Sequence, residues 1–229
     1  MGSGSLFADL RSARTFGLPR YRRKVNLIPL LLALCLPPAW AQHSALFEAV
    51  EAGRLEEVER LMGAGAGINA RNDDAETLLY VAAEKGHGTI VAFLLGKGAD
   101  VKIPTKNGET ALHAAALNGD PDLLAALLER GAEVNRANRD GERPLFWAAA
   151  TGHGRVAKLL IDRGAEVNAT DQRGNSALHG AVDGGHQTAA SLLLNQGANA
   201  ALRNAAGDTA ADIARRRGHG EIVKLLQSR

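Results

Sequence analysis

The sequence predicts an all-α repeat solenoid built from stacked helix pairs, and two periodic features predict it. Apolar residues recur in pairs at helical spacing, as at Ile90, Val91, Leu94 and Leu95. Glycines recur every 33 residues in three registers: Gly53, Gly86, Gly119, Gly152, Gly185 and Gly218; Gly65, Gly98, Gly131, Gly164 and Gly197; and Gly108, Gly141, Gly174 and Gly207. A fixed period of this length indicates modules that stack on their neighbours instead of forming one globular core.

Within each period, the residues predict a first helix, a second helix and a turn. Hydroxyl side chains suited to a helix N-cap stand at Thr77, Thr110, Ser176 and Thr209, and Pro144 suits a first helical position. Small residues follow, and a recurrent glycine, which tolerates a positive φ, ends the helix. We expect units at 42–75, 76–108, 109–141, 142–174 and 175–207 and a shortened unit at 208–229, of which the first and last are polar caps.

The segment Thr110-Ala111-Leu112-His113-Ala114-Ala115, followed by Gly119, closely resembles the helix-opening motif of ankyrin repeats. Ser176-Ala177-Leu178-His179 is a similar copy, and the resemblance spans about residues 44–229. It implies a curved ankyrin-repeat stack of helix pairs with projecting β-hairpin fingers. Lys102 and Pro104 depart from the family pattern in the second finger, and Asp74-Ala75 stands in the first finger where later turns carry glycine.

Residues 1–41 have the three-part layout of a secretory signal peptide: a basic region at 20–24, an apolar region at 25–36, and small residues before an expected cleavage after Ala41. The alternative is a membrane anchor, but a span needs about 20 apolar residues and this run of 12 includes Asn26 and Pro29. Leu34 before Cys35 disfavours a lipoprotein, and the twin-arginine pattern is incomplete. We expect Sec-type export to the periplasm or beyond, with no stable membrane anchor after cleavage; the true start codon within 1–19 stays open.

Composition and motifs exclude several function classes. Outside residues 1–41 the chain has 21 basic and 24 acidic residues, whereas nucleic-acid binding needs clustered positive charge. Histidines recur once per unit, and packed helices lie about 8–10 Å apart, too far for them to share one metal ion. No cysteine remains after cleavage, and no Gly-x-Ser-x-Gly motif is present. We therefore expect no enzyme, and no catalytic residue, metal or cofactor.

In ankyrin repeats, fingertips and exposed positions late in the first helix carry the binding specificity. Carried over residue by residue, the resemblance implies these partner-binding candidates: Lys106, Asn107, Leu117, Asn118, Arg139, Asp140, Trp147, Thr151, Gln172 and Arg173. Trp147 either fills space between units or anchors a partner. We expect an exported, monomeric, non-catalytic scaffold that binds a protein on its concave face. The alternative is a dedicated inhibitor, immunity-type or chaperone-like partner of a specific exported enzyme.

Overall fold

The structure is a computed structural model that describes residues 39–228, so the basic and apolar regions at 20–24 and 25–36 lie outside the described residues. The described part contains twelve α-helices: α2 (Ala39–Glu51), α3 (Leu55–Gly63), α4 (Leu78–Glu84), α5 (Gly88–Gly96), α6 (Ala111–Asn118), α7 (Pro121–Glu129), α8 (Pro144–Ala150), α9 (Gly154–Asp162), α10 (Ala177–Asp183), α11 (Gln187–Asn195), α12 (Ala210–Arg217) and α13 (Gly220–Gln227). The expected cleavage point after Ala41 falls inside α2.

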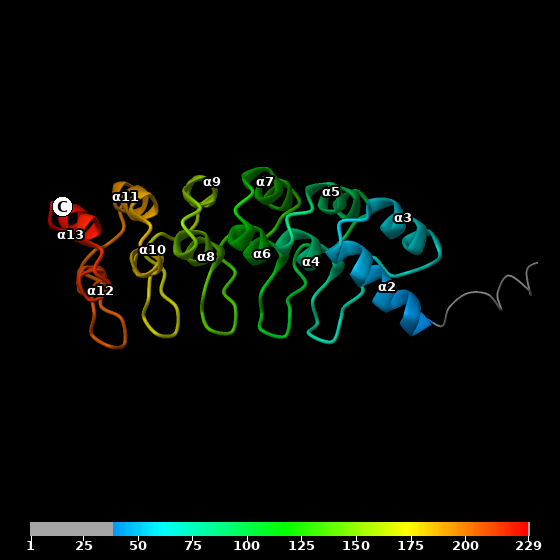
Figure 1. The fold of residues 1–229 in the computed structure, drawn as a ribbon, viewed down its shortest axis with the longest axis horizontal. Helices are drawn as coiled ribbons and strands as arrows, with labels where there is room; N and C mark the ends of the chain where they lie inside the picture. The colour runs from blue at the N-terminus through cyan, green and yellow to red at the C-terminus, as the bar shows by residue number, and fades with distance from the viewer. Residues whose placement is uncertain (1–38, 229) are drawn as a thin grey trace, which may run out of the picture. The chain divides into compact units, whose positions relative to one another are not determined.

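The helices form six successive pairs, from α2–α3 to α12–α13, that stack in a row (Figure 1). In Figure 1 the first helices run along the middle of the row, the second helices line one side, and loops project from the other side. First helices pack against the first helices of adjoining pairs, and second helices against second helices. The predicted all-α repeat stack is therefore confirmed.

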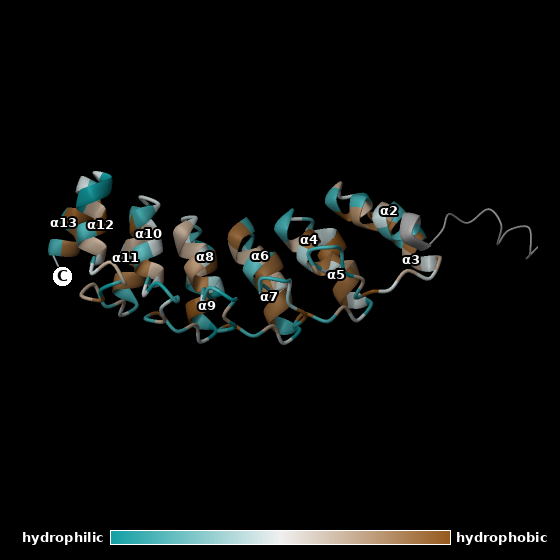
Figure 2. Ribbon diagram, turned by 90° about the horizontal axis from the view of Figure 1, so that it is seen from below, coloured by the Kyte–Doolittle hydropathy of each residue, from teal (hydrophilic) through white to brown (hydrophobic). Residues whose placement is uncertain are grey.

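The core is a continuous layer of aliphatic and small side chains shared by all six pairs. Ala114, Ala115 and Ala116 are fully buried in α6, which lets α4 and α8 approach it closely. Leu124 and Leu127 of α7 are fully buried as well. Figure 2 shows hydrophobic residues recurring in pair after pair along the row. Because small residues form the contacts between first helices, the stack needs few aromatic side chains, which agrees with an aromatic content of 4%.

Reciprocal side-chain caps start three of the first helices. The residue pairs are Thr110 with His113, Ser176 with His179, and Thr209 with Asp212. In each pair the later side chain accepts the N–H of the cap residue, which would otherwise lack a helical partner. At the other end of α6, Gly119 takes φ +89° and closes the helix in the left-handed conformation. The helix starts predicted at these hydroxyl residues are thus confirmed.

The loops at 69–76, 102–109, 135–142, 168–175 and 201–208, here called fingers, differ from the expected β-hairpins. No β-strand forms among the described residues, and two fingers keep only one antiparallel bridge each, Arg71 with Thr77 and Thr170 with Ser176. In the third finger, the N–H of Asn138 donates to the Glu142 carbonyl oxygen at 2.9 Å. The fingers are therefore tight turns, too short for a ladder of cross-strand pairs.

The first finger makes its turn without glycine. Ala75 has φ +60°, the one positive φ of a non-glycine residue in the described part of the chain. This conformation costs an alanine about 1–2 kcal/mol. The side-chain oxygen of Asn72 accepts the N–H groups of Asp74 and Glu76 at 3.0 and 2.9 Å. These bonds hold the turn in the same form as the later fingers, whose corresponding residue is glycine.

Candidate binding surface

Neighbouring fingertips are joined edge to edge by main-chain hydrogen bonds. An N–H of each later fingertip donates to a carbonyl of the one before it: Lys106 to Asp74 at 3.0 Å, Arg139 to Asn107 at 2.7 Å, Gln172 to Asp140 at 2.8 Å and Ala205 to Arg173 at 2.7 Å. The ladder uses main-chain groups, and two tip side chains add to it: Lys106 pairs with Asp74 at 3.8 Å and Gln172 donates to the Arg139 carbonyl oxygen at 2.5 Å. The six fingertip candidates are all exposed: Lys106, Asn107, Arg139, Asp140, Gln172 and Arg173.

A polar side chain at the root of each finger fixes its turn. Its oxygen accepts N–H groups from the residues two and four positions later, and the root residues are Asn72, Thr105, Asn138, Asp171 and Asn204. Our sequence reasoning missed this register, although its signal is plain: Asn, Asp or Thr every 33 residues. These residue types bond to their own main chain in turns, so the register predicts rigid fingertips.

Two candidates at the ends of first helices are engaged inside the stack. Asn118 donates through Nδ2 to the Glu84 carbonyl oxygen at 3.3 Å, a bond between the second and third units. Thr151 donates through Oγ1 to the carbonyl oxygen of Trp147 at 2.7 Å. Both side chains are half-buried. Their polar groups therefore stabilise helix ends in the absence of any partner.

Leu117 is the one large hydrophobic side chain exposed in the described part, with 38% of its surface accessible. It lies in the last turn of α6, seven residues after Thr110. That spacing places it about 10 Å along the helix from the point where the finger enters. Leu117 thus lies at the opposite end of α6 from the finger that leads into this helix.

Trp147 packs between units. Its ring lies edge-on to the ring of His113 in the preceding unit, with centroids 5.6 Å apart and an interplanar angle of 74°. Its Nε1 donates to Oε2 of Glu142 at 2.8 Å. A half-buried tryptophan with a satisfied N–H favours the space-filling role over that of a partner-facing anchor.

The sequence reasoning also missed four carboxylates, each four positions after a root residue: Glu76, Glu109, Glu142 and Asp208. They follow the 33-residue register, and each one accepts a hydrogen bond from a nearby side chain. Tyr80, for example, donates its hydroxyl to Oε2 of Glu109 at 3.2 Å. Burial, and then the charge of Glu109, raises the pKa of Tyr80 above its ordinary value, which keeps the hydroxyl a neutral donor.

A family model described as ankyrin repeats (3 copies) matches residues 24–105, 46–138, 97–171 and 145–229. The chain belongs to the ankyrin-repeat family. A comparison with curated proteins found no match. Ankyrin repeats are protein–protein interaction modules and are generally non-catalytic. The row of rigid fingertips is therefore a candidate protein-binding surface.

The histidines of this ankyrin-repeat stack tie units to one another. The Thr110 N–H donates to Nδ1 of His113 at 3.1 Å, which leaves the proton on Nε2 to donate to the Glu142 carbonyl oxygen at 3.3 Å. His87 and His153 each bond through Nε2 to a carbonyl oxygen in the unit before, at 2.9 and 3.0 Å. Within residues 39–228, no three His, Cys, Asp or Glu side chains are grouped closely enough to hold a metal ion.

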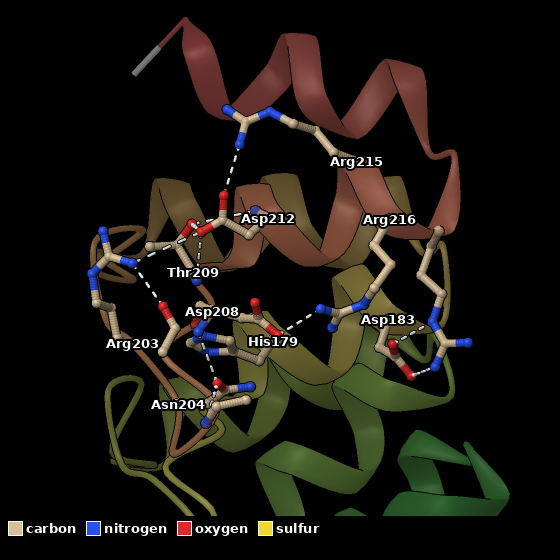
Figure 3. Close-up of polar contacts among 12 residues, drawn as sticks. His179, Asp183, Arg203, Asn204, Asp208, Thr209, Asp212, Arg215 and Arg216 are labelled. Carbon is tan, nitrogen blue, oxygen red and sulfur yellow. Dashed lines mark hydrogen bonds and ion pairs between the residues drawn. The ribbon is translucent and has the colours of Figure 1, made fainter.

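The basic run at the end of α12 is paired with acids of the same stack, as Figure 3 shows for Arg215 and Arg216. The pairs are Arg215 with Asp212 at 2.8 Å, Arg216 with Asp208 at 2.7 Å, and Arg217 with Asp183 at 2.7 and 3.0 Å. Asp183 belongs to α10, so Arg217 links the last two ankyrin repeats. The run serves the C-terminal repeat and does not form a free basic patch.

No helix within residues 39–228 combines the length and the apolar character that a membrane crossing requires.

Proposed function

We propose that this ankyrin-repeat protein is exported from the cytoplasm and binds a partner protein outside it, without catalysing a reaction. The partner would bind on the face formed by the fingertips and the ends of the first helices. The observation that carries the proposal is the main-chain ladder between the fingertips. A surface that is ordered before encounter loses little conformational entropy on binding. Leu117 adds an apolar contact on α6, and Arg139 adds a fingertip cation that forms no ion pair with any described residue.

Substitution of Leu117 and Arg139 tests the binding surface. We expect the tagged full chain to capture a protein from the exported fraction, and Leu117→Asp together with Arg139→Glu to weaken that binding at least tenfold, about the cost of a lost hot spot. Both side chains are exposed, so the melting temperature should not change. The matched control is Ala92→Asp with Arg155→Glu, two exposed residues on second helices with the same change in charge. A captured partner that the first variant still binds at full strength would place the surface elsewhere.

Export is tested separately by N-terminal sequencing of protein recovered outside the cytoplasm. The small residues before the predicted cleavage point lead us to expect a chain that starts at Gln42. A start elsewhere would move the cleavage point. Recovery of a chain that retains the apolar region at 25–36 would contradict cleavage and favour an anchor.

A further inference from the structure

An open groove lies between the first finger and α2, the helix at one end of the row in Figure 1. Its volume is about 650 Å³, enough for several side chains. Phe47 and His43 form its apolar part, with ring centroids 5.1 Å apart. Glu48 and Glu51 line it from α2, and Asp73 lines it from the finger. Carboxylates thus stand on two elements around an aromatic floor.

The first unit supplies no cation to this groove. Residues 42–75 hold seven acidic side chains and only three arginines. Arg60 pairs with Glu57 at 2.7 Å, and Arg71 donates to main-chain carbonyls of Ala75 and Pro104. Neither these two nor Arg54 lines the groove.

The three groove carboxylates also lack ion pairs with the rest of the described chain. No lysine or arginine nitrogen of residues 39–228 comes within ion-pair distance of Glu48, Glu51 or Asp73. Lys85, which feels the charge of Glu51, pairs with Glu84 at 2.8 Å. The groove is therefore a negatively charged recess whose charge the stack does not neutralise.

We propose that this groove binds a lysine- or arginine-rich segment of the partner protein. Charge complementarity selects the occupant, because three carboxylates line a space that the cations of residues 39–228 leave open. The long aliphatic stems of lysine and arginine can cover Phe47 and His43 while their charged ends reach the carboxylates. The proposal rests on the proposed function, since it names the chemistry of the segment that docks at one end of the same surface. Binding in this groove would fix the orientation of the partner, with its basic segment over the first unit.

The test measures binding of a fluorescent ten-residue peptide of alternating lysine and glycine to the full chain by anisotropy, at low and at physiological salt. We expect wild-type binding that weakens with salt. Glu48→Gln, Glu51→Gln and Asp73→Asn together should weaken it about tenfold, the combined effect of three exposed charge pairs. The control variant removes three exposed carboxylates elsewhere, through Glu56→Gln, Glu59→Gln and Glu129→Gln. This variant should bind within about twofold of wild type, since its net charge changes equally but its groove is intact.

Three results would overturn the proposal. Equal weakening by both triple variants would show attraction to net charge alone, and no binding by the wild type at low salt would show that the groove does not accept a basic segment. A glutamate–glycine peptide that binds equally well would also exclude charge selection. None of these results depends on the Leu117 and Arg139 variant. Loss of the groove proposal therefore remains distinguishable from loss of the binding surface, which that variant tests through capture of the partner.

Discussion

Acidification from pH 7.5 to pH 5 should lower the free energy of unfolding by about 2 kcal/mol through His113 alone. Burial lowers the pKa of His113 from 6.5 to about 4, because the stack disfavours the charged ring. The unfolded chain therefore takes up a proton at higher pH than the folded chain does. Stability that is fully present above pH 6.5 is lost progressively as the pH falls toward 4.

The structural consequence of protonation is equally specific. Nδ1 of His113 accepts the N–H of Thr110, so a proton on this nitrogen removes the acceptor that caps α6. The His113 ring would then no longer be held in the position from which it contacts Trp147 and bonds through Nε2 to the Glu142 carbonyl oxygen of the next unit. We expect the third and fourth units to loosen first when the pH falls.

Urea denaturation of the wild type and of His113→Gln across this pH range separates His113 from other groups. Glutamine at the same position can still accept the cap N–H but does not titrate, so the variant should lose the slope between pH 7.5 and 5. The lowered pKa of Glu57, held down by Arg60, and that of Asp212, held down by Thr209, affect stability only below about pH 4.5. An identical slope in both proteins would show that His113 is not the titrating group.

Much of the fold was predictable because the same physical requirement repeats in every unit. The hydroxyl caps, the buried alanines of the first helix and the paired leucines of the second helix each recur at one spacing. Repetition turns weak local signals into a strong one. The fingers fold back on themselves as predicted, but each turn, closed by a root side chain such as Asn138, is followed by at most one antiparallel bridge and no strand.

The candidate surface was predictable only in part. The exposed fingertips follow from their position in the repeat, and the exposure of Leu117 agrees with its place at the end of α6. The internal bonds of Asn118, Thr151 and Trp147 depend on which neighbour comes within reach in the next unit. Sequence spacing gives no distances between units, and so it could not separate these residues from freely exposed ones.

Replacing Gly141 by alanine should destabilise the stack by about 3 kcal/mol, by two mechanisms that add. Gly141 has φ +83°, which costs an alanine about 1–2 kcal/mol. A Cβ at this position would also lie 2.9 Å from the main-chain nitrogen of Gln172 and 3.2 Å from the main chain of Asp171. Main-chain atoms cannot rotate away as a side chain can. The substitution should therefore push apart the two fingers that the Gln172 N–H joins through Asp140.

Two other glycines separate these mechanisms. Gly131 has a nearly identical φ of +84°, but a Cβ there would meet nothing within 4 Å, so Gly131→Ala should show the conformational cost alone. Gly154 opens α9 with open space around it, and Gly154→Ala should leave stability unchanged or raise it by up to about 1 kcal/mol. The urea midpoint should be highest for Gly154→Ala, lower for Gly131→Ala and lowest for Gly141→Ala. Equal loss in the Gly131 and Gly141 variants would mean that the fingers can separate at no cost. The ladder would then not be what keeps the fingertips rigid.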